Sequence, residues 1–116
     1  PETAATTQLI GPAEFASMRP DAVLLNLSRG GIVDEAALSE ALGNGELRGA
    51  ALDVFRTEPL PPDSPLRAHG NVLITPHAGS ISPRFWDRQG ALMRRNFEHW
   101  RSGRPLENQV DKERGY

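Results

Sequence analysis

The chain of 116 residues contains no cysteine, which excludes a disulfide-stabilised fold and any metal or iron–sulfur site with cysteine ligands. It has no excess of one charge, because 13 Lys and Arg residues oppose 15 Asp and Glu residues and the formal net charge is -2. This balance argues against binding to nucleic acid or to an anionic membrane. Its apolar runs, such as residues 22–25 and 71–74, are far shorter than the roughly 18 residues of a membrane span. We therefore expect a soluble protein whose partner is a small molecule or another protein.

The start of the chain also lacks a targeting signal. Residues 1–7 have neither the charged beginning nor the apolar stretch of a signal peptide, and Pro1 is not an initiator methionine. We expect this start to be a processed end or a cut.

The order of apolar runs and helix signals predicts a layered α/β domain. The predicted elements are a short helix from Pro12 that ends before Arg19, a strand over 22–27, a helix capped by Asp34 and ended by Gly43 or Gly45, a strand over 49–55, a proline-rich loop over 58–65, a strand over 71–75, and a helix from Ser82–Pro83 to about Arg101. The strand runs do not alternate apolar with polar residues, which is typical of parallel strands covered on both faces. Three such strands make a thin sheet that needs neighbours, so the sequence predicts half of a sheet.

Polar residues follow each predicted strand, at the sheet edge where open α/β sheets bind their ligands. Arg29 follows the first strand, and its planar guanidinium can bind a carboxylate or phosphate through two hydrogen bonds. The alternative is that Arg29 caps a helix or pairs with a surface acid. His77 follows the third strand, and a histidine near a carboxylate can act as an acid or base near neutral pH. The alternative is a turn histidine that the backbone satisfies.

Two carboxylates lie at the same predicted edge. Glu58 is either the group that orients the imidazole of His77 or a solvated loop acid. Asp53 ends the second strand among apolar residues, so its carboxylate needs hydrogen bonds, from a ligand or as a cap on the following turn. Arg29, Glu58 and His77 together supply an anion anchor, an orienting carboxylate and a proton donor.

Other kinds of site find little support. The glycines beside Arg29 lack the G-x-G-x-x-G spacing, and no Walker lysine follows them. No second histidine stands four residues after His77, so we expect no metal site. We interpret His69 as a loop residue and His99 as a residue on a helix surface.

Three blocks of this sequence resemble the C-terminal signature blocks of the D-isomer-specific 2-hydroxyacid dehydrogenases. They are Asn26–Asp34 (NLSRGGIVD), Gly49–Pro59 (GAALDVFRTEP) and Thr75–His77 (TPH). In addition, Pro1–Thr3 resembles the turn after an earlier strand of that family, and Val110–Tyr116 resembles the end of its glyoxylate/hydroxypyruvate reductase branch. The resemblance covers essentially the whole chain.

The resemblance implies roles for the residues at the sheet edge. Arg29 would anchor the carboxylate of the substrate, His77 would be the general acid that protonates its carbonyl oxygen, and Glu58 would hold His77. Asp53 would bond the carboxamide of the nicotinamide. The residues implied to line the cofactor pocket are Leu27, Ser28, Arg29, Asp53, His77, Ala78 and Gly79.

The resemblance also implies a fold and a reaction. The fold would be the C-terminal half of a Rossmann-type doubly wound parallel sheet plus a long C-terminal helix. Residues 1–79 would form that half, residues 80–103 the helix, which packs on the sheet or on another domain, and residues 104–116 a tail. The reaction would be the reduction of a small 2-oxo acid, such as glyoxylate or hydroxypyruvate, to the D-2-hydroxy acid. NAD or NADP would be the cofactor, with NADPH favoured by the branch.

Further expectations concern the complete protein. The resemblance implies a cytoplasmic enzyme that forms a homodimer. The G-x-G-x-x-G motif and the substrate domain of the family are absent from these 116 residues, so we expect them to act as part of a longer chain. Two alternatives stay open, namely a non-catalytic nucleotide-binding regulatory protein and an inactive truncated fragment.

Overall fold

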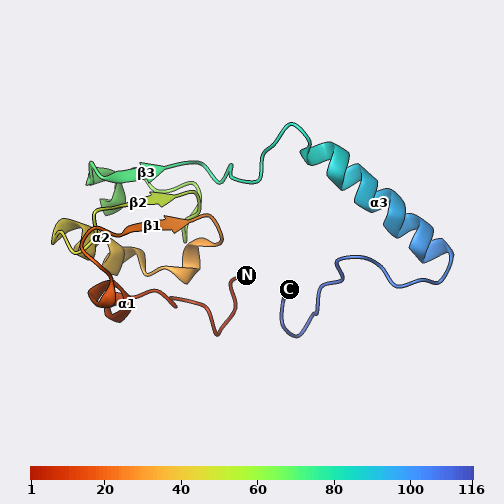
Figure 1. The fold of residues 1–116 in the computed structure, drawn as a ribbon, viewed down its shortest axis with the longest axis horizontal. Coiled ribbons are helices and arrows are strands. Elements are labelled where there is room, and N and C mark those ends of the chain that lie inside the picture. Colours follow the sequence, from red (N-terminus) through yellow and green to blue (C-terminus); the bar gives the residue numbers. More distant parts are fainter. The chain divides into compact units, whose positions relative to one another are not determined.

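A computed structural model describes all 116 residues, in two compact units (Figure 1). The first unit spans Pro1–Gly79 and holds the sheet, and the second spans Ser80–Tyr116 and holds one long helix. The candidate site residues all belong to the first unit.

The sheet of the first unit has three parallel strands, β1 (Val23–Asn26), β2 (Gly49–Leu52) and β3 (Val72–Ile74), in the order β1-β2-β3. Leu25, Ala51 and Leu73 lie in one row across the sheet. The parallel arrangement confirms the sequence prediction, and it brings the carboxyl ends of all three strands to the same edge.

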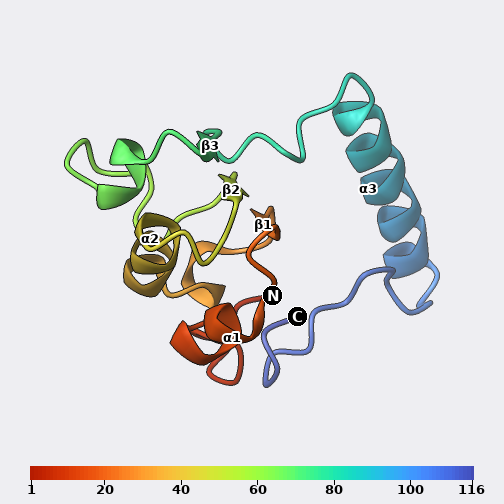
Figure 2. The same cartoon turned by 60° about the vertical axis from the view of Figure 1, so that its left-hand side comes forward.

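The helices of this unit pack on one face of the sheet (Figure 2). They are α1 (Pro12–Ser17), α2 (Glu35–Gly43) and the short 3-10 helix η2 (Pro65–Ala68). The side chains buried most completely between these elements are Phe15, Leu38, Leu47 and Leu66. Removal of this apolar surface from water is the main stabilising contribution to the unit.

The ends of α2 follow the sequence prediction. The carboxylate of Asp34 accepts hydrogen bonds from the backbone N–H groups of Ala36 and Ala37, both at 3.1 Å, and so caps the helix. The helix ends at Gly43, and Gly45 adopts a left-handed φ of 73° that a residue with a side chain rarely adopts.

The prediction that the strands are covered on both faces is wrong for this unit. Val23, Leu25 and Leu73 are 42%, 65% and 63% exposed, because no helix of the first unit packs on their side of the sheet. The apolar character of this face is present, as the sequence pattern indicates, but residues 1–79 contain no element that covers it.

All three strands are shorter than predicted, β1 and β3 by one residue at each end and β2 at its carboxyl end. The second strand stops at Leu52 rather than at residue 55, because the backbone N–H of Phe55 leaves the sheet and donates to the carboxylate of Glu58. In the loop that follows β1, Gly30–Ile32 form a turn of 3-10 helix, η1.

The second unit contains the helix α3 (Phe85–Arg101). It begins three residues later than predicted, since the N–H of Phe85 bonds to the carbonyl of Ser82 and residues 83–84 form a turn. None of its residues is buried, and its largest exposed side chains are Trp86, Met93, Phe97 and Trp100. Neither α3 nor any other helix of the chain has the length and apolar character needed to cross a membrane.

Candidate active site

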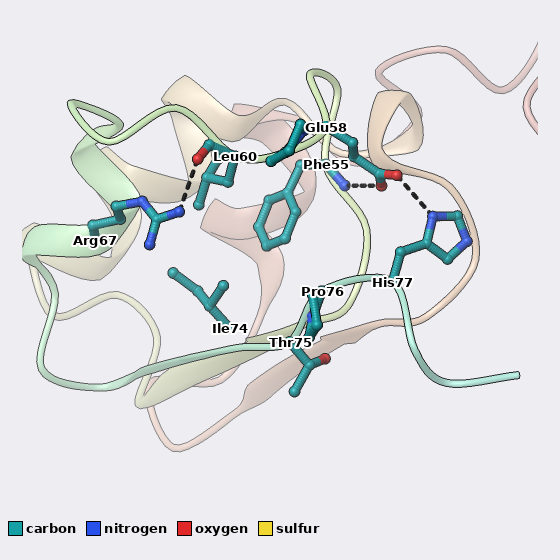
Figure 3. A pocket seen from close by; sticks show the side chains of 9 residues that line it. Phe55, Glu58, Leu60, Arg67, Ile74, Thr75, Pro76 and His77 are labelled. Carbon is teal, nitrogen blue, oxygen red and sulfur yellow. Dashed lines mark hydrogen bonds and ion pairs between the residues drawn. The ribbon is translucent and has the colours of Figure 1, made fainter. Parts of the chain in front are cut away.

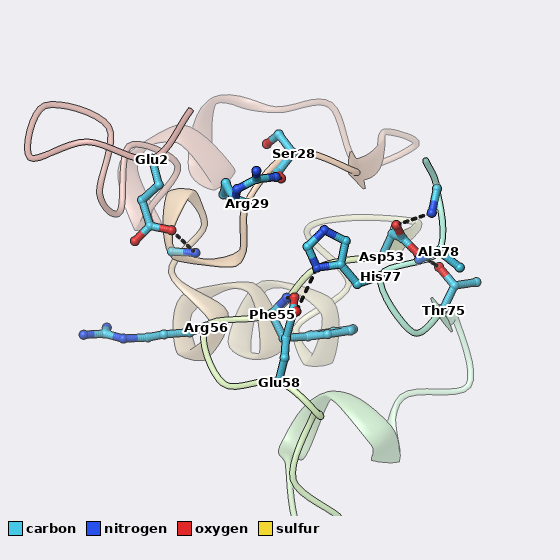
Figure 4. Close-up of polar contacts among 12 residues, drawn as sticks. Glu2, Ser28, Arg29, Asp53, Phe55, Arg56, Glu58, Thr75, His77 and Ala78 are labelled. Carbon is cyan, nitrogen blue, oxygen red and sulfur yellow. Dashed lines mark hydrogen bonds and ion pairs between the residues drawn. The ribbon is translucent and has the colours of Figure 1, made fainter. Parts of the chain in front are cut away.

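Residues that follow the three strands converge at the carboxyl edge of the sheet (Figure 4). The loop after β1 approaches the loop after β2 so closely that Gly30 lies against the backbone of Phe55. It also approaches the turn after β3, since the Leu27 side chain lies beside Gly79. The loops that carry Arg29, Glu58 and His77 are therefore joined by direct contacts, although these residues are far apart in the sequence.

The imidazole of His77 is held by Glu58. Its Nδ1 atom lies 2.8 Å from Oε2 of Glu58, while Oε1 of the same carboxylate accepts the backbone N–H of Phe55 at 2.9 Å. The His77 hydrogen bond, followed by that of Phe55, lowers the pKa of Glu58. An ionised carboxylate can only accept, so Nδ1 carries a proton and the other ring nitrogen, Nε2, is left for a further partner. Glu58 thus contacts the imidazole of His77, and its role as an orienting group stays a prediction.

The pair is only partly shielded from water. The side chains of His77 and Glu58 are 44% and 37% exposed. Solvent therefore weakens their mutual attraction, and the geometry of the pair matters more than its net strength.

The backbone of His77 adopts an unusual conformation. Its φ of 53° lies in the left-handed region, which a residue with a side chain occupies only when its surroundings impose it. The surrounding turn is in fact tied down on both sides, because Thr75, Ala78 and Gly79 all donate hydrogen bonds to Asp53.

Asp53 is the buried carboxylate of the site, with 3% of its surface exposed. Its Oδ1 accepts from the hydroxyl of Thr75 at 2.5 Å and from the N–H of Ala78 at 2.8 Å, and its Oδ2 accepts from the N–H of Gly79 at 2.7 Å. These hydrogen bonds, that of Thr75 first, lower the pKa of Asp53. Asp53 therefore anchors the turn that carries His77, rather than capping the turn that follows β2.

Arg29 presents its guanidinium without an acidic partner in the chain. Its side chain is exposed, and Nη1 donates only to the neighbouring carbonyl of Ser28, at 2.6 Å. The residue precedes η1, yet its side chain forms no capping hydrogen bond. Neither alternative for Arg29, a helix cap or a surface ion pair, is found.

Leu27, Ser28, Ala78 and Gly79 form the rim between the first and third loops. Leu27 is 65% exposed and so offers an apolar surface at the end of β1. Gly79 has no room for a side chain, because a Cβ atom there would lie 2.9 Å from Oδ2 of Asp53 and 3.3 Å from Leu27. No glycine-rich cradle for a pyrophosphate is present among these residues.

Sequence reasoning missed Asn26 and Thr75. Asn26 is the last residue of β1, is 6% exposed, and bonds to both Ser28 and Arg29. Its signal in the sequence was a polar residue inside an apolar run. Thr75 was predicted as the end of a strand, and only its hydrogen bond to Asp53 reveals its place in the site.

A cavity of about 490 Å³, which sequence reasoning also missed, lies beside the Glu58–His77 pair (Figure 3). Its walls are mainly apolar, and its lining residues are Phe55, Glu58, Pro59, Leu60, Arg67, Ile74, Thr75, Pro76 and His77. Arg67 donates to the carbonyls of Pro61 and Leu60, at 2.9 and 2.8 Å, and so closes the loop over the cavity. Arg29 and Asp53 do not line it.

The remaining histidines are engaged elsewhere in the chain. His69 lies at the end of η2, with its Nε2 atom 2.8 Å from the hydroxyl of Ser39. His99 lies on α3, with its Nδ1 atom 2.7 Å from the carbonyl of Pro105. These positions agree with their interpretation as a loop and a helix-surface residue.

The fold and this sheet edge define a class of protein, namely one that contains part of a Rossmann-type NAD(P)-binding domain. Comparison with known families makes the assignment more specific. Residues 1–79 match the NAD binding domain of the D-isomer specific 2-hydroxyacid dehydrogenases. The chain belongs to this family, which confirms the resemblance seen in the sequence.

Individual relatives agree with that assignment. A glyoxylate/hydroxypyruvate reductase B from Pectobacterium carotovorum is 52% identical over 82 residues, which are 71% of this chain and 26% of the relative. A D-isomer specific 2-hydroxyacid dehydrogenase from Xanthobacter autotrophicus, solved with NADPH and MES, is 42% identical with a TM-score of 0.91 over 100% of this chain and 47% of that one.

A third relative was solved with a small acid. The NADPH-dependent glyoxylate/hydroxypyruvate reductase from Sinorhizobium meliloti, in complex with NADP and malonate, is 39% identical, with a TM-score of 0.77 over 88% of this chain and 32% of that one. The chain thus spans less than half the length of each of these relatives.

Proposed function

We propose that these residues form part of the active site of an enzyme that reduces a small 2-oxo acid, such as glyoxylate or hydroxypyruvate, to the D-2-hydroxy acid. The observation that carries the proposal is the Glu58–His77 pair, 2.8 Å apart, on a sheet edge that also presents the unpaired guanidinium of Arg29. Together these groups supply a proton donor, its orienting carboxylate and a binding site for the carboxylate of a substrate.

The guanidinium of Arg29 would bind the carboxylate of the 2-oxo acid through two parallel hydrogen bonds. This contact orients the adjacent carbonyl group toward the imidazole, which lowers the entropic cost of reaching the transition state. The only partner of the guanidinium within the chain is the Ser28 carbonyl, so binding a substrate there breaks no ion pair.

His77 would donate the proton. In its protonated form the ring donates from Nδ1 to Glu58 and from Nε2 to the carbonyl oxygen of the substrate. As the carbonyl carbon is reduced, the Nε2 proton moves to the oxygen, which becomes the hydroxyl group, and the ring is left neutral with its proton on Nδ1. Glu58 stays ionised throughout, because its hydrogen bonds keep its pKa low.

A reduced nicotinamide, when bound, would supply the hydride for the carbonyl carbon. In this proposal, the rim formed by Leu27, Ser28, Ala78 and Gly79 contacts the ring, and Oδ2 of Asp53, which accepts one hydrogen bond within the chain, accepts a second from the carboxamide. We propose NADPH rather than NADH as the cofactor. The sequence resemblance to the reductase branch supports this choice, and so do the relatives solved with NADPH or NADP.

The second unit would contact another part of the complete enzyme. Trp86, Met93, Phe97 and Trp100 of α3 are all more than half exposed, and large apolar side chains rarely stay together in water without a partner surface. The homodimer and the cytoplasmic location that the sequence resemblance implies stay predictions for the complete protein.

The test is the oxidation of NADPH by the full-length protein that carries these residues, with glyoxylate or hydroxypyruvate as substrate. His77→Ala is expected to lower kcat by about 100-fold to 10,000-fold, the usual contribution of a positioned general acid. The dissociation constant of NADPH should change little, because the imidazole is proposed to act on the substrate. An unaltered kcat in the variant would refute the role of His77.

A further inference from the structure

Asn26 is a buried residue of the site that takes no part in the proposed chemistry. It ends β1 and is 6% exposed, so its side-chain amide is removed from water at the point where the strand meets the loop that carries Arg29. A buried amide in this position is costly unless all of its atoms are hydrogen-bonded.

Both polar atoms of the amide form hydrogen bonds within that loop. Its Oδ1 accepts from the backbone N–H of Ser28 at 3.2 Å and from the Ser28 hydroxyl at 2.9 Å. Its Nδ2 donates to the backbone carbonyl of Arg29 at 3.0 Å. One side chain therefore bonds to the residues on both sides of the peptide that leads into Arg29.

The same residue also connects the loop to the neighbouring strand. The backbone carbonyl of Asn26 accepts the N–H of Asp53 at 3.0 Å, and Asp53 in turn anchors the turn that carries His77. Hydrogen bonds to Asp53, directly after β2, therefore hold both the end of β1 that leads to Arg29 and the turn that carries the imidazole.

We infer that Asn26 is a positioning residue for Arg29, which sets where the guanidinium meets the carboxylate of the substrate relative to His77. The inference rests on the proposed function, since it concerns the same site. The guanidinium has no acidic partner to hold it, so the backbone at positions 28 and 29 decides the origin of its side chain. A loop that is free to shift would place the anchor poorly for binding the carboxylate of the substrate.

The test compares the full-length wild type with Asn26→Leu, which keeps the number of side-chain heavy atoms and removes all three hydrogen bonds. We expect the KM for glyoxylate to rise by about 10-fold to 100-fold while kcat changes by less than about 3-fold, because an anchor that holds substrate and transition state alike affects mainly KM. The inhibition constant of oxamate, a carboxylate that is not reduced, should rise in parallel. A purely structural role would instead lower the thermal stability and the active fraction without changing KM.

A double-mutant cycle decides whether Asn26 acts through Arg29. In an Arg29→Met background, Asn26→Leu should change KM by less than about 2-fold, since the group that it positions is gone. If the two effects multiply instead, Asn26 does not act through Arg29 and the inference fails.

Asn71 offers the matched control, because its amide donates to the Arg48 carbonyl at 3.0 Å at the opposite end of the sheet. Asn71→Leu should leave the KM for glyoxylate unchanged. If Asn26→Leu does not fold, Asn26→Ser, which keeps a short polar group, is measured in the same way and should raise KM by a smaller factor. An active wild type combined with an unaltered KM in the folded Asn26 variants overturns the inference alone, whereas a wild type without reductase activity overturns the proposed function together with it.

Discussion

The contact between Gly30 and Phe55 gives the sharpest prediction about this site. In an alanine variant, the Cβ atom at position 30 would lie well inside 3.0 Å of the carbonyl group of Phe55 and of the backbone nitrogen of Arg56. These are backbone atoms that cannot rotate away, so the two loops need to separate by about 1 Å or more to restore ordinary van der Waals distances.

This separation acts on the groups proposed to do the chemistry. Gly30 follows Arg29 directly, and the N–H of Phe55 holds Glu58, so Gly30→Ala is expected to move the carboxylate anchor away from the His77–Glu58 pair. A displacement of about 1 Å typically costs a factor of about 100 in rate, and we expect a fall of this size in kcat/KM for glyoxylate. Overpacking of this kind should also destabilise the protein by about 1–3 kcal/mol.

The assay is steady-state NADPH oxidation by the full-length protein, together with its thermal unfolding. Gly90→Ala is the matched control, because a Cβ atom at this position of α3 meets nothing within 4 Å and alanine favours a helix over glycine. The control should keep wild-type kcat/KM and should not lose stability. A Gly30→Ala variant with wild-type kcat/KM would refute the argument that this close approach sets the geometry of the site.

Three further predictions concern the charged groups of the site. Arg29→Lys should raise the KM for glyoxylate by about 10-fold or more with a smaller effect on kcat, since an ammonium group cannot form the two parallel hydrogen bonds; an unchanged KM in steady-state kinetics would exclude the anchor role. Glu58→Gln should lower kcat at pH 7.5 by about 10-fold to 100-fold, because an amide has one acceptor oxygen in place of the two that contact Phe55 and His77. An unaltered kcat in this variant counts against the orienting role. Folding lowers the pKa of Asp53, so its contribution to stability is present above about pH 4 and is lost as the pH falls through the folded-state pKa. In urea unfolding between pH 7 and pH 2, Asp53→Asn should therefore be less stable than the wild type at pH 7 and should lose less stability in acid. A loss as steep as that of the wild type would assign the acid sensitivity to other groups.

The sequence was sufficient for most of the secondary structure because the signals involved are local. Asp34 caps α2 through N–H groups two and three residues away, and the apolar runs mark the three strands. The sequence did not show where β2 ends, because the carboxylate that accepts the backbone N–H of Phe55 belongs to the side chain of Glu58. The sequence also could not show which segment covers each face of the sheet, because an apolar face does not specify its partner.

The candidate site divides in the same way. The sequence was sufficient to select its residues, because Arg29, Asp53, Glu58 and His77 follow strands whose carboxyl ends must share one edge of a parallel sheet. Only the tertiary structure decided the partners: Glu58 bonds to His77, Asp53 holds the turn around His77, and Asn26 holds the backbone at Arg29. The first two of these contacts join segments about 20 residues or more apart along the chain, so they depend on how the loops pack after the sheet forms. Residue type and order thus determined which groups are available, and packing determined which of them meet.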